Sequence, residues 1–241
     1  MRIIPLSPPG SSTYSNLLSW SRKLGISLIT KPCDVENVVL IGNGTPDDIV
    51  LMILLNKHNG KDNLESCVGI AKSKRLLEGS IKSAVDIVDK SNGKVSCILI
   101  AIDQEKNSLD DLWSKIERKL SELASYNRVE DWKRLKIYDC RRGTRAFKLI
   151  IIINGIENQK YRSHTIEDHL LEVTIRVMGE ERISQYLAES NSNPKKVWSR
   201  LSKKEQQNIL QEIKNSSMNA LEDSFEWHIK AINALKHCKQ I

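Results

Sequence analysis

The sequence lacks several features that would assign it to a common functional class. No apolar run approaches the roughly 20 residues that a membrane-spanning helix needs, and the N-terminal segment MRIIPLSPPG contains no apolar signal-peptide core. We therefore expect a cytoplasmic protein with no membrane partner. Only 5% of the residues are aromatic, which argues against a surface built to stack many bases.

Clusters of cysteine or histidine residues with the spacing of a zinc site are also missing. The five cysteines occur singly, without a Cys-x-x-Cys pair. His164 and His169 are five residues apart and do not share a helix face, so the histidines show no zinc-ligand spacing either. An odd, unclustered set of cysteines predicts reduced intracellular thiols and argues against structural zinc. Any metal is expected to be a hard cation with oxygen ligands.

Basic residues, by contrast, outnumber acidic ones, and the hydrophobic content is ordinary for a globular protein. The chain carries 37 Lys and Arg against 30 Asp and Glu, a net charge of +7. This balance makes an anionic partner plausible without identifying it. A chain of 241 residues that is 40% hydrophobic can bury the core of one large domain, or of one domain with an appendage.

Apolar runs and amphipathic segments alternate through residue 178, which predicts an α/β fold with a mostly parallel central sheet flanked by helices. Strands are expected at residues 2–6, 27–30, 37–41, 66–72, 95–102, 135–138 and 147–154, and helices at 14–24, 49–58, 75–90, 109–124 and 166–178. Residues 1–178 would form this domain, with a β-α-β lead-in over 1–36.

The remaining residues, 179–241, show only helical patterns, at 181–189, 195–201 and 203–239. We expect a helical C-terminal extension that packs on the α/β domain or on another subunit, which would make a homo-oligomer. Lys195 and Lys196 belong to a basic group around Trp198 in this extension. A nucleic-acid-binding face is the less favoured interpretation of that group.

Two acids follow the most strongly apolar strand pattern, at residues 95–102. Asp103 and Glu105 are two positions apart, so in an extended backbone they would point the same way and converge on one cation. An acid in such a place often caps the next helix, but Ser108 and Asp110 are better placed for that. The crevice beyond the strand ends of an open α/β sheet is where ligands bind.

A glycine-rich turn, Gly-Asn-Gly-Thr-Pro-Asp-Asp, follows the strand pattern at 37–41. It contains Asn43, Asp47 and Asp48, and its glycines would expose backbone amides at a helix start, where an anion is favourably placed. The turn lacks the Lys-Ser/Thr ending of a P-loop. A simple strand-to-helix turn is the alternative interpretation.

Glu167 and Asp168 open the helix expected at 166–178. They would either complement the helix N-terminus, with Thr165 as the cap, or add a further acidic ligand to the same crevice. Between the last two strands, residues 133–148 hold seven basic residues and one acid.

Arg141, Arg142 and Arg145 surround a glycine in that basic stretch. Their guanidinium groups predict a phosphate clamp near the metal crevice. A solvated loop is the alternative.

Three stretches, IGNGTPDD (41–48), IDQEKNSLDDLW (102–113) and HTIEDHLLE (164–172), resemble in this order the Toprim domain of topoisomerases, primases and OLD-type nucleases. They are most similar to a small uncharacterised Toprim-like family found largely in prokaryotes. The likeness spans residues 37–178. The resemblance implies that Asp103 and Glu105 hold Mg²⁺, or Mn²⁺, with Glu167 or Asp168 as a supporting acid.

The same resemblance implies a general acid or base on the first of these stretches. There the family pattern has Glu, whereas this chain has Asn43, which cannot carry a proton; Asp47 or Asp48 would have to substitute. The expected function is metal-dependent cleavage of a phosphodiester or phosphoanhydride in nucleic acid or nucleotide. The rivals are a catalytically degenerate nucleic-acid-binding or assembly module, and a sensor that binds a nucleotide at the glycine-rich turn.

Overall fold

The computed structural model describes residues 2–29, 34–41, 46–58, 67–72, 77–157 and 160–238. Within them, seven strands form one sheet of order β1-β3-β2-β4-β7-β6-β5. Neighbouring strands from β1 to β7 pair in parallel, and β6 and β5 continue the sheet antiparallel. The strands are β1 (Arg2–Pro5), β2 (Val35–Ile41), β3 (Cys67–Lys72), β4 (Cys97–Asp103), β5 (Ser125–Asp131), β6 (Leu135–Arg142) and β7 (Arg145–Asn154). The predicted α/β class is confirmed.

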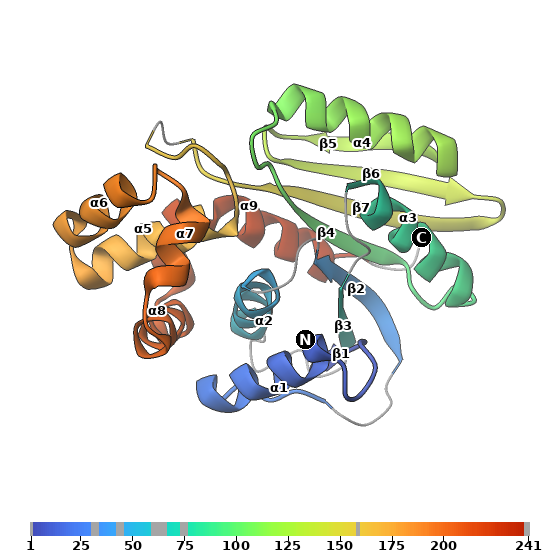
Figure 1. Ribbon diagram of the computed structural model, residues 1–241. Coiled ribbons are helices and arrows are strands. Elements are labelled where there is room, and N and C mark those ends of the chain that lie inside the picture. The colour runs from blue at the N-terminus through green and yellow to red at the C-terminus, as the bar shows by residue number, and fades with distance from the viewer. Residues whose placement is uncertain are drawn as a thin grey trace.

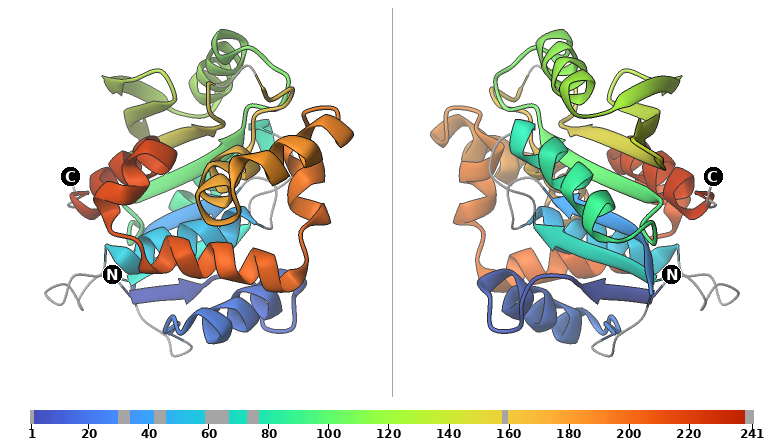
Figure 2. Two further views of the ribbon diagram at one scale, coloured as in Figure 1. Left: turned by 90° about the vertical axis from the view of Figure 1, so that its left-hand side faces the viewer. Right: turned by 90° about the vertical axis from the view of Figure 1, so that its right-hand side faces the viewer.

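Helices pack on both faces of this sheet (Figures 1 and 2). They are α1 (Ser12–Leu24), α2 (Asp47–Lys57), α3 (Leu77–Lys90), α4 (Leu109–Leu123), α5 (Ile166–Met178), α6 (Glu180–Glu189), α7 (Pro194–Arg200), α8 (Lys203–Asn215) and α9 (Met218–Lys236). In the described part of the chain, no helix has both the length and the apolar character that crossing a membrane requires.

Strand β4 shows why both faces are covered. Its Cys97, Leu99 and Ala101 belong to a core shared with α1, α2, α8 and α9, whereas Ile98, Ile100 and Ile102 belong to a second core with α3 and α4. Alternate side chains of a strand point to opposite faces, so a strand that is apolar at every position from Cys97 to Ile102 needs two layers of helices. The C-terminal helices α8 and α9 thus share the first core with the sheet.

Three local expectations differ from the structure. Strand β5 was not predicted, because six of its seven residues are exposed at the sheet edge and it has no apolar alternation. The strand expected at 27–30 is reduced to one bridge, between Ile3 and Leu28. The single helix expected over 203–239 is two helices, because Ser217 caps a new one by accepting a hydrogen bond from the Ala220 amide at 3.2 Å.

The cysteine prediction is wrong for at least three of the five residues. Cys97 in β4 and Cys238, just after α9, form a disulfide bond across 141 residues of sequence. Cys67 is also disulfide-bonded, and Cys140 is a buried free thiol. Spacing along the chain did not reveal the Cys97 pair, because only the packing of α9 on the sheet brings the two residues together.

Candidate functional site

The carboxyl ends of β2 and β4 form the crevice in which the candidate site lies. These strands are neighbours, but α2, which follows β2, packs in one core while α4, which follows β4, packs in the other. The chain therefore leaves the two strands toward opposite faces, and this is the point at which open α/β sheets form a ligand-binding crevice. Asp47 begins α2 and Asp103 ends β4, so each acid lies at this crevice.

Asn154, at the end of β7, links the two acids. It is fully buried and lies opposite Asp103 in the sheet register. Its Nδ2 donates to Asp47 Oδ1 at 2.9 Å and to Asp103 Oδ1 at 3.0 Å, and its Oδ1 accepts from His228 Nε2 at 2.9 Å. A single amide nitrogen thus holds two buried carboxylates side by side, and a histidine of α9 fixes the orientation of the amide.

Glu167, in the first turn of α5, brings a third carboxyl group to the crevice. The residue is 6% exposed, and within the described chain its Oε2 is buried without a hydrogen-bond partner. Burial and the nearby charge of Asp103 raise the pKa of Glu167 to about 7. Burial and the charges of Asp103 and Glu167 also raise the pKa of Asp47 well above its usual value. The charge of Asp103 therefore opposes the ionisation of both Asp47 and Glu167.

Glu105 reaches the crevice through a strained turn. Its φ of 55° lies in the left-handed region, which a residue other than glycine adopts only when its surroundings hold it there. Two backbone hydrogen bonds with His164, of 2.8 and 2.9 Å, provide that support, and the Ser163 hydroxyl donates to Glu105 Oε2 at 2.9 Å. The extended geometry from which convergence with Asp103 was predicted is absent, since β4 ends at Asp103.

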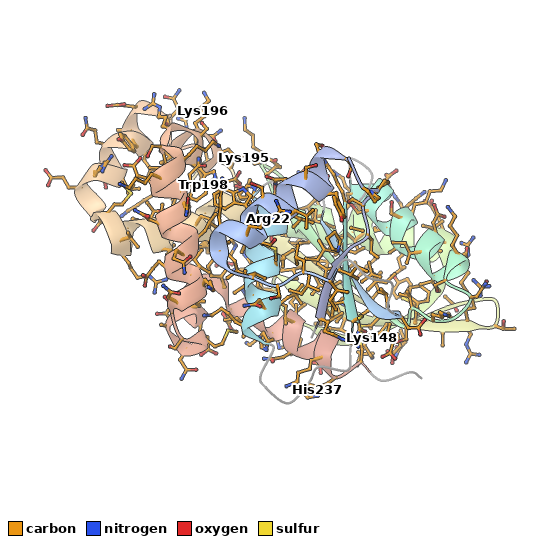
Figure 3. All side chains as sticks on the ribbon, turned by 90° about the horizontal axis from the view of Figure 1, so that it is seen from below. Arg22, Lys148, Lys195, Lys196, Trp198 and His237 are labelled. Atoms are coloured by element: carbon orange, nitrogen blue, oxygen red, sulfur yellow. A yellow bond between two sulfur atoms is a disulfide. The ribbon has the colours of Figure 1, made fainter. Side chains whose placement is uncertain are left out.

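Asp103 and Glu105 nevertheless converge on one positive charge, the ammonium group of Lys195. The Lys195 ammonium lies 3.1 Å from Asp103 Oδ2 and 2.5 Å from Glu105 Oε1. Partial burial lowers the pKa of Lys195, but the charges of Asp103 and Glu105 outweigh this and raise it overall. In Figure 3, Lys195 lies between α7 and the body of the protein, whereas Lys196 lies farther out. An ammonium thus occupies the space between two of the predicted metal ligands.

Other predicted site residues have different surroundings. Asp48 accepts hydrogen bonds from Asn16 in α1, at 3.4 Å, and from the Ile49 amide, at 2.9 Å, so it faces away from Asn154. Asp168 accepts from the backbone amide of Thr165 at 3.2 Å and from other groups around the start of α5, so it acts as a helix cap. Asn43 lies outside the described residues.

The arginine loop lies at the opposite end of the sheet. Arg145 begins β7 and the crevice lies at its end, nine residues and roughly 30 Å away along the strand. Arg142 donates to the Leu123 carbonyl at 2.9 Å and Arg145 to the Val88 carbonyl at 3.0 Å, so both bind the last turns of helices. The expectation that Arg141, Arg142 and Arg145 border the crevice is therefore wrong, and phosphate binding by them elsewhere stays a prediction.

Sequence reasoning missed two central residues of the site. Asn154 had a signal, because it follows an apolar strand as Asp103 does and so had to end at the same edge of the sheet. Lys195 had none, since it comes from a helix 90 residues after Glu105 in the chain. Its position depends on the packing of α7 against α5.

The donor set suits a hard divalent cation, because it consists of carboxylate oxygens, one of them without a partner. As the side chains stand, however, no group of three or more His, Cys, Asp or Glu residues in the described segments has the arrangement of a metal site. A metal would therefore require the side chains to move, starting with the Lys195 ammonium. Comparisons with protein-family models, curated proteins and solved structures found no match.

Proposed function

We propose that this protein is a Toprim-like, Mg²⁺-dependent enzyme that cleaves phosphodiester or phosphoanhydride bonds in nucleic acid or nucleotide. The observation that carries the proposal is the buried Oε2 of Glu167, which has no hydrogen-bond partner in the described chain. Glu167 lies near Asp47 and Asp103, the two carboxyl groups that Asn154 holds together. A buried carboxylate oxygen without a donor is costly. A divalent cation bound by Glu167 and Asp103 would remove that cost.

The charge balance of the crevice supports the same proposal. Asp47, Asp103, Glu105 and Glu167 contribute four carboxyl groups, and Lys195 forms ion pairs with two of them, Asp103 and Glu105. Protonation of Asp47 and Glu167 relieves the excess in the absence of metal, which is consistent with their raised pKa values. Binding of Mg²⁺ would replace the proton on Glu167 and, when a phosphate is bound, neutralise the charge of the phosphate.

Asp47 is our candidate for proton transfer in place of the family's glutamate. Its pKa is raised, chiefly by burial, so it holds a proton at a higher pH than an ordinary aspartate does. A hydrogen bond of 2.9 Å from the side-chain amide of Asn154 orients the Asp47 carboxyl group. Asp103, Glu105 and Glu167 are then left as the metal ligands, while Asp48 and Asp168 have structural roles.

Calorimetric titration with Mg²⁺ and Mn²⁺ tests this proposal. Wild-type protein should bind saturably, and Asp103→Asn and Glu167→Gln should each weaken binding at least tenfold. Glu130→Gln is the matched control, because Glu130 is an exposed acid on β5. If wild-type protein binds neither metal at millimolar concentration, the proposal fails; if it binds metal, cleavage of a labelled oligonucleotide is the next assay, with Asp47→Asn expected to be inactive.

One observation favours the catalytically degenerate alternative. The Lys195 ammonium already neutralises Asp103 and Glu105, with contacts of 3.1 and 2.5 Å. A permanent lysine there would make the acidic group a structural ion-pair network in a binding module. Under this alternative the wild type does not bind metal at all, whereas under our proposal it binds metal in competition with Lys195.

A further inference from the structure

An open cavity of about 550 Å³ adjoins the acidic crevice. Glu105 forms part of its wall, together with Lys106, Ser108, Arg162 and His164. Both sides of the cavity derive from one structural feature, the backbone bridge between Glu105 and His164. Because that bridge is antiparallel, the residue after Glu105 and the residues before His164 extend toward the same side. Glu105 is therefore shared between the cavity wall and the proposed metal site.

Its two strong cations have no partner within the described chain. The side chains of Lys106 and Arg162 are exposed and make no ion pair or hydrogen bond there. This distinguishes them from Arg142 and Arg145, which bind helix ends. His164 uses Nδ1 in its 3.1 Å contact with Asp168, which leaves its Nε2 without a contact among the described residues.

We propose that this cavity binds the phosphodiester backbone of a nucleic-acid strand whose neighbouring phosphate lies at the acidic crevice. The inference rests on the proposed function and specifies its substrate. A guanidinium and an ammonium without partners suit phosphate oxygens, and they outnumber the one acid in the wall, Glu105.

The lining of the cavity also distinguishes a backbone from a base. Among the described residues that form the wall there is no Phe, Tyr or Trp. Base-stacking proteins rely on such rings. Recognition here would therefore depend on phosphate charge and tolerate different base sequences.

Fluorescence anisotropy with a labelled single-stranded oligonucleotide, recorded in EDTA over a range of salt concentrations, tests the inference. The double variant Lys106→Gln/Arg162→Gln removes both cations, and Lys115→Gln/Arg118→Gln removes the same charge from exposed positions of α4. Each phosphate contact on a single strand contributes about 0.7 to the slope of log K against log salt. The first variant should lower that slope by about 1.4 and weaken binding at least tenfold, while the second should leave it near the wild-type value.

Equal slopes for the two double variants would overturn the inference. A nucleoside triphosphate that binds more weakly to the first variant, with oligonucleotide binding unchanged, would also overturn it and assign the cavity to free nucleotides. Because EDTA removes divalent metal, these results do not depend on the metal site. Failure of the proposed function appears separately, as the absence of metal binding in calorimetry.

Discussion

Replacement of Lys195 by methionine tests how the acidic crevice is neutralised. Methionine keeps much of the aliphatic length of lysine and removes the ammonium that contacts Asp103 Oδ2 at 3.1 Å and Glu105 Oε1 at 2.5 Å. The side chain of Asp103 is only 1% exposed, so its charge would lose an ion pair that solvent replaces poorly. We expect two opposite effects, a less stable metal-free protein and tighter metal binding.

The expected loss of stability in Lys195→Met follows from how far Lys195, Asp103 and Glu105 are exposed to solvent. Lys195 is 37% exposed and Glu105 43% exposed, so solvent screens the second pair strongly, and most of the effect comes from Asp103. We expect a loss of about 1 to 2 kcal/mol in the free energy of unfolding. For a chain of this size that corresponds to a Tm lower by about 2 to 8 °C. Since Mg²⁺ no longer has to displace the ammonium, its affinity should rise about 5- to 30-fold.

Thermal melts in EDTA and calorimetric titration with Mn²⁺ measure the two effects. Lys196→Met is the control, because it removes the same charge from the next residue, which is exposed and forms no ion pair in the described chain. The control should match the wild type in both measurements. Equal Mn²⁺ affinity for Lys195→Met and wild type would refute the competition between lysine and metal, and an unchanged Tm would refute the structural role of the ion pair.

Three further predictions concern buried residues, two of them in the crevice and one in the disulfide bond at the other end of β4. The folded-state pKa of Glu167 is raised to about 7. The stability that its protonated form contributes is therefore complete below pH 4.5 and is lost as the pH rises through 7, whereas metal affinity rises over the same interval. Glu167→Gln should remove this part of the pH dependence of stability in urea titrations. Asn154→Leu removes one hydrogen bond from each of Asp47, Asp103 and His228 and should cost about 2 to 4 kcal/mol in urea unfolding. A cost under about 0.5 kcal/mol would contradict the bonding described. Cys238→Ala opens a loop of 141 residues and should cost about 3 to 5 kcal/mol, and a reducing agent should lower the Tm of wild type more than that of the variant.

Local sequence patterns were sufficient to predict most of the strands and the place of the crevice. The run at 95–102 is apolar at every position except Ser96, so it was expected to be a central strand covered on both faces. An acid directly after such a strand had to lie at the carboxyl edge of the sheet, where Asp103 and Asp47 are found. Both conclusions depend only on backbone geometry and on neighbouring residues.

Tertiary packing decided what those acids contact. The left-handed turn at Glu105 is stable only because His164, 59 residues later, forms a backbone bridge with it. Lys195 reaches the same acids from α7, and the arginine loop lies at the far end of the sheet because β6 and β7 form an antiparallel hairpin. These contacts join residues far apart in the chain, and their stability comes from the burial of whole helices and strands, so no local pattern of residues contains them.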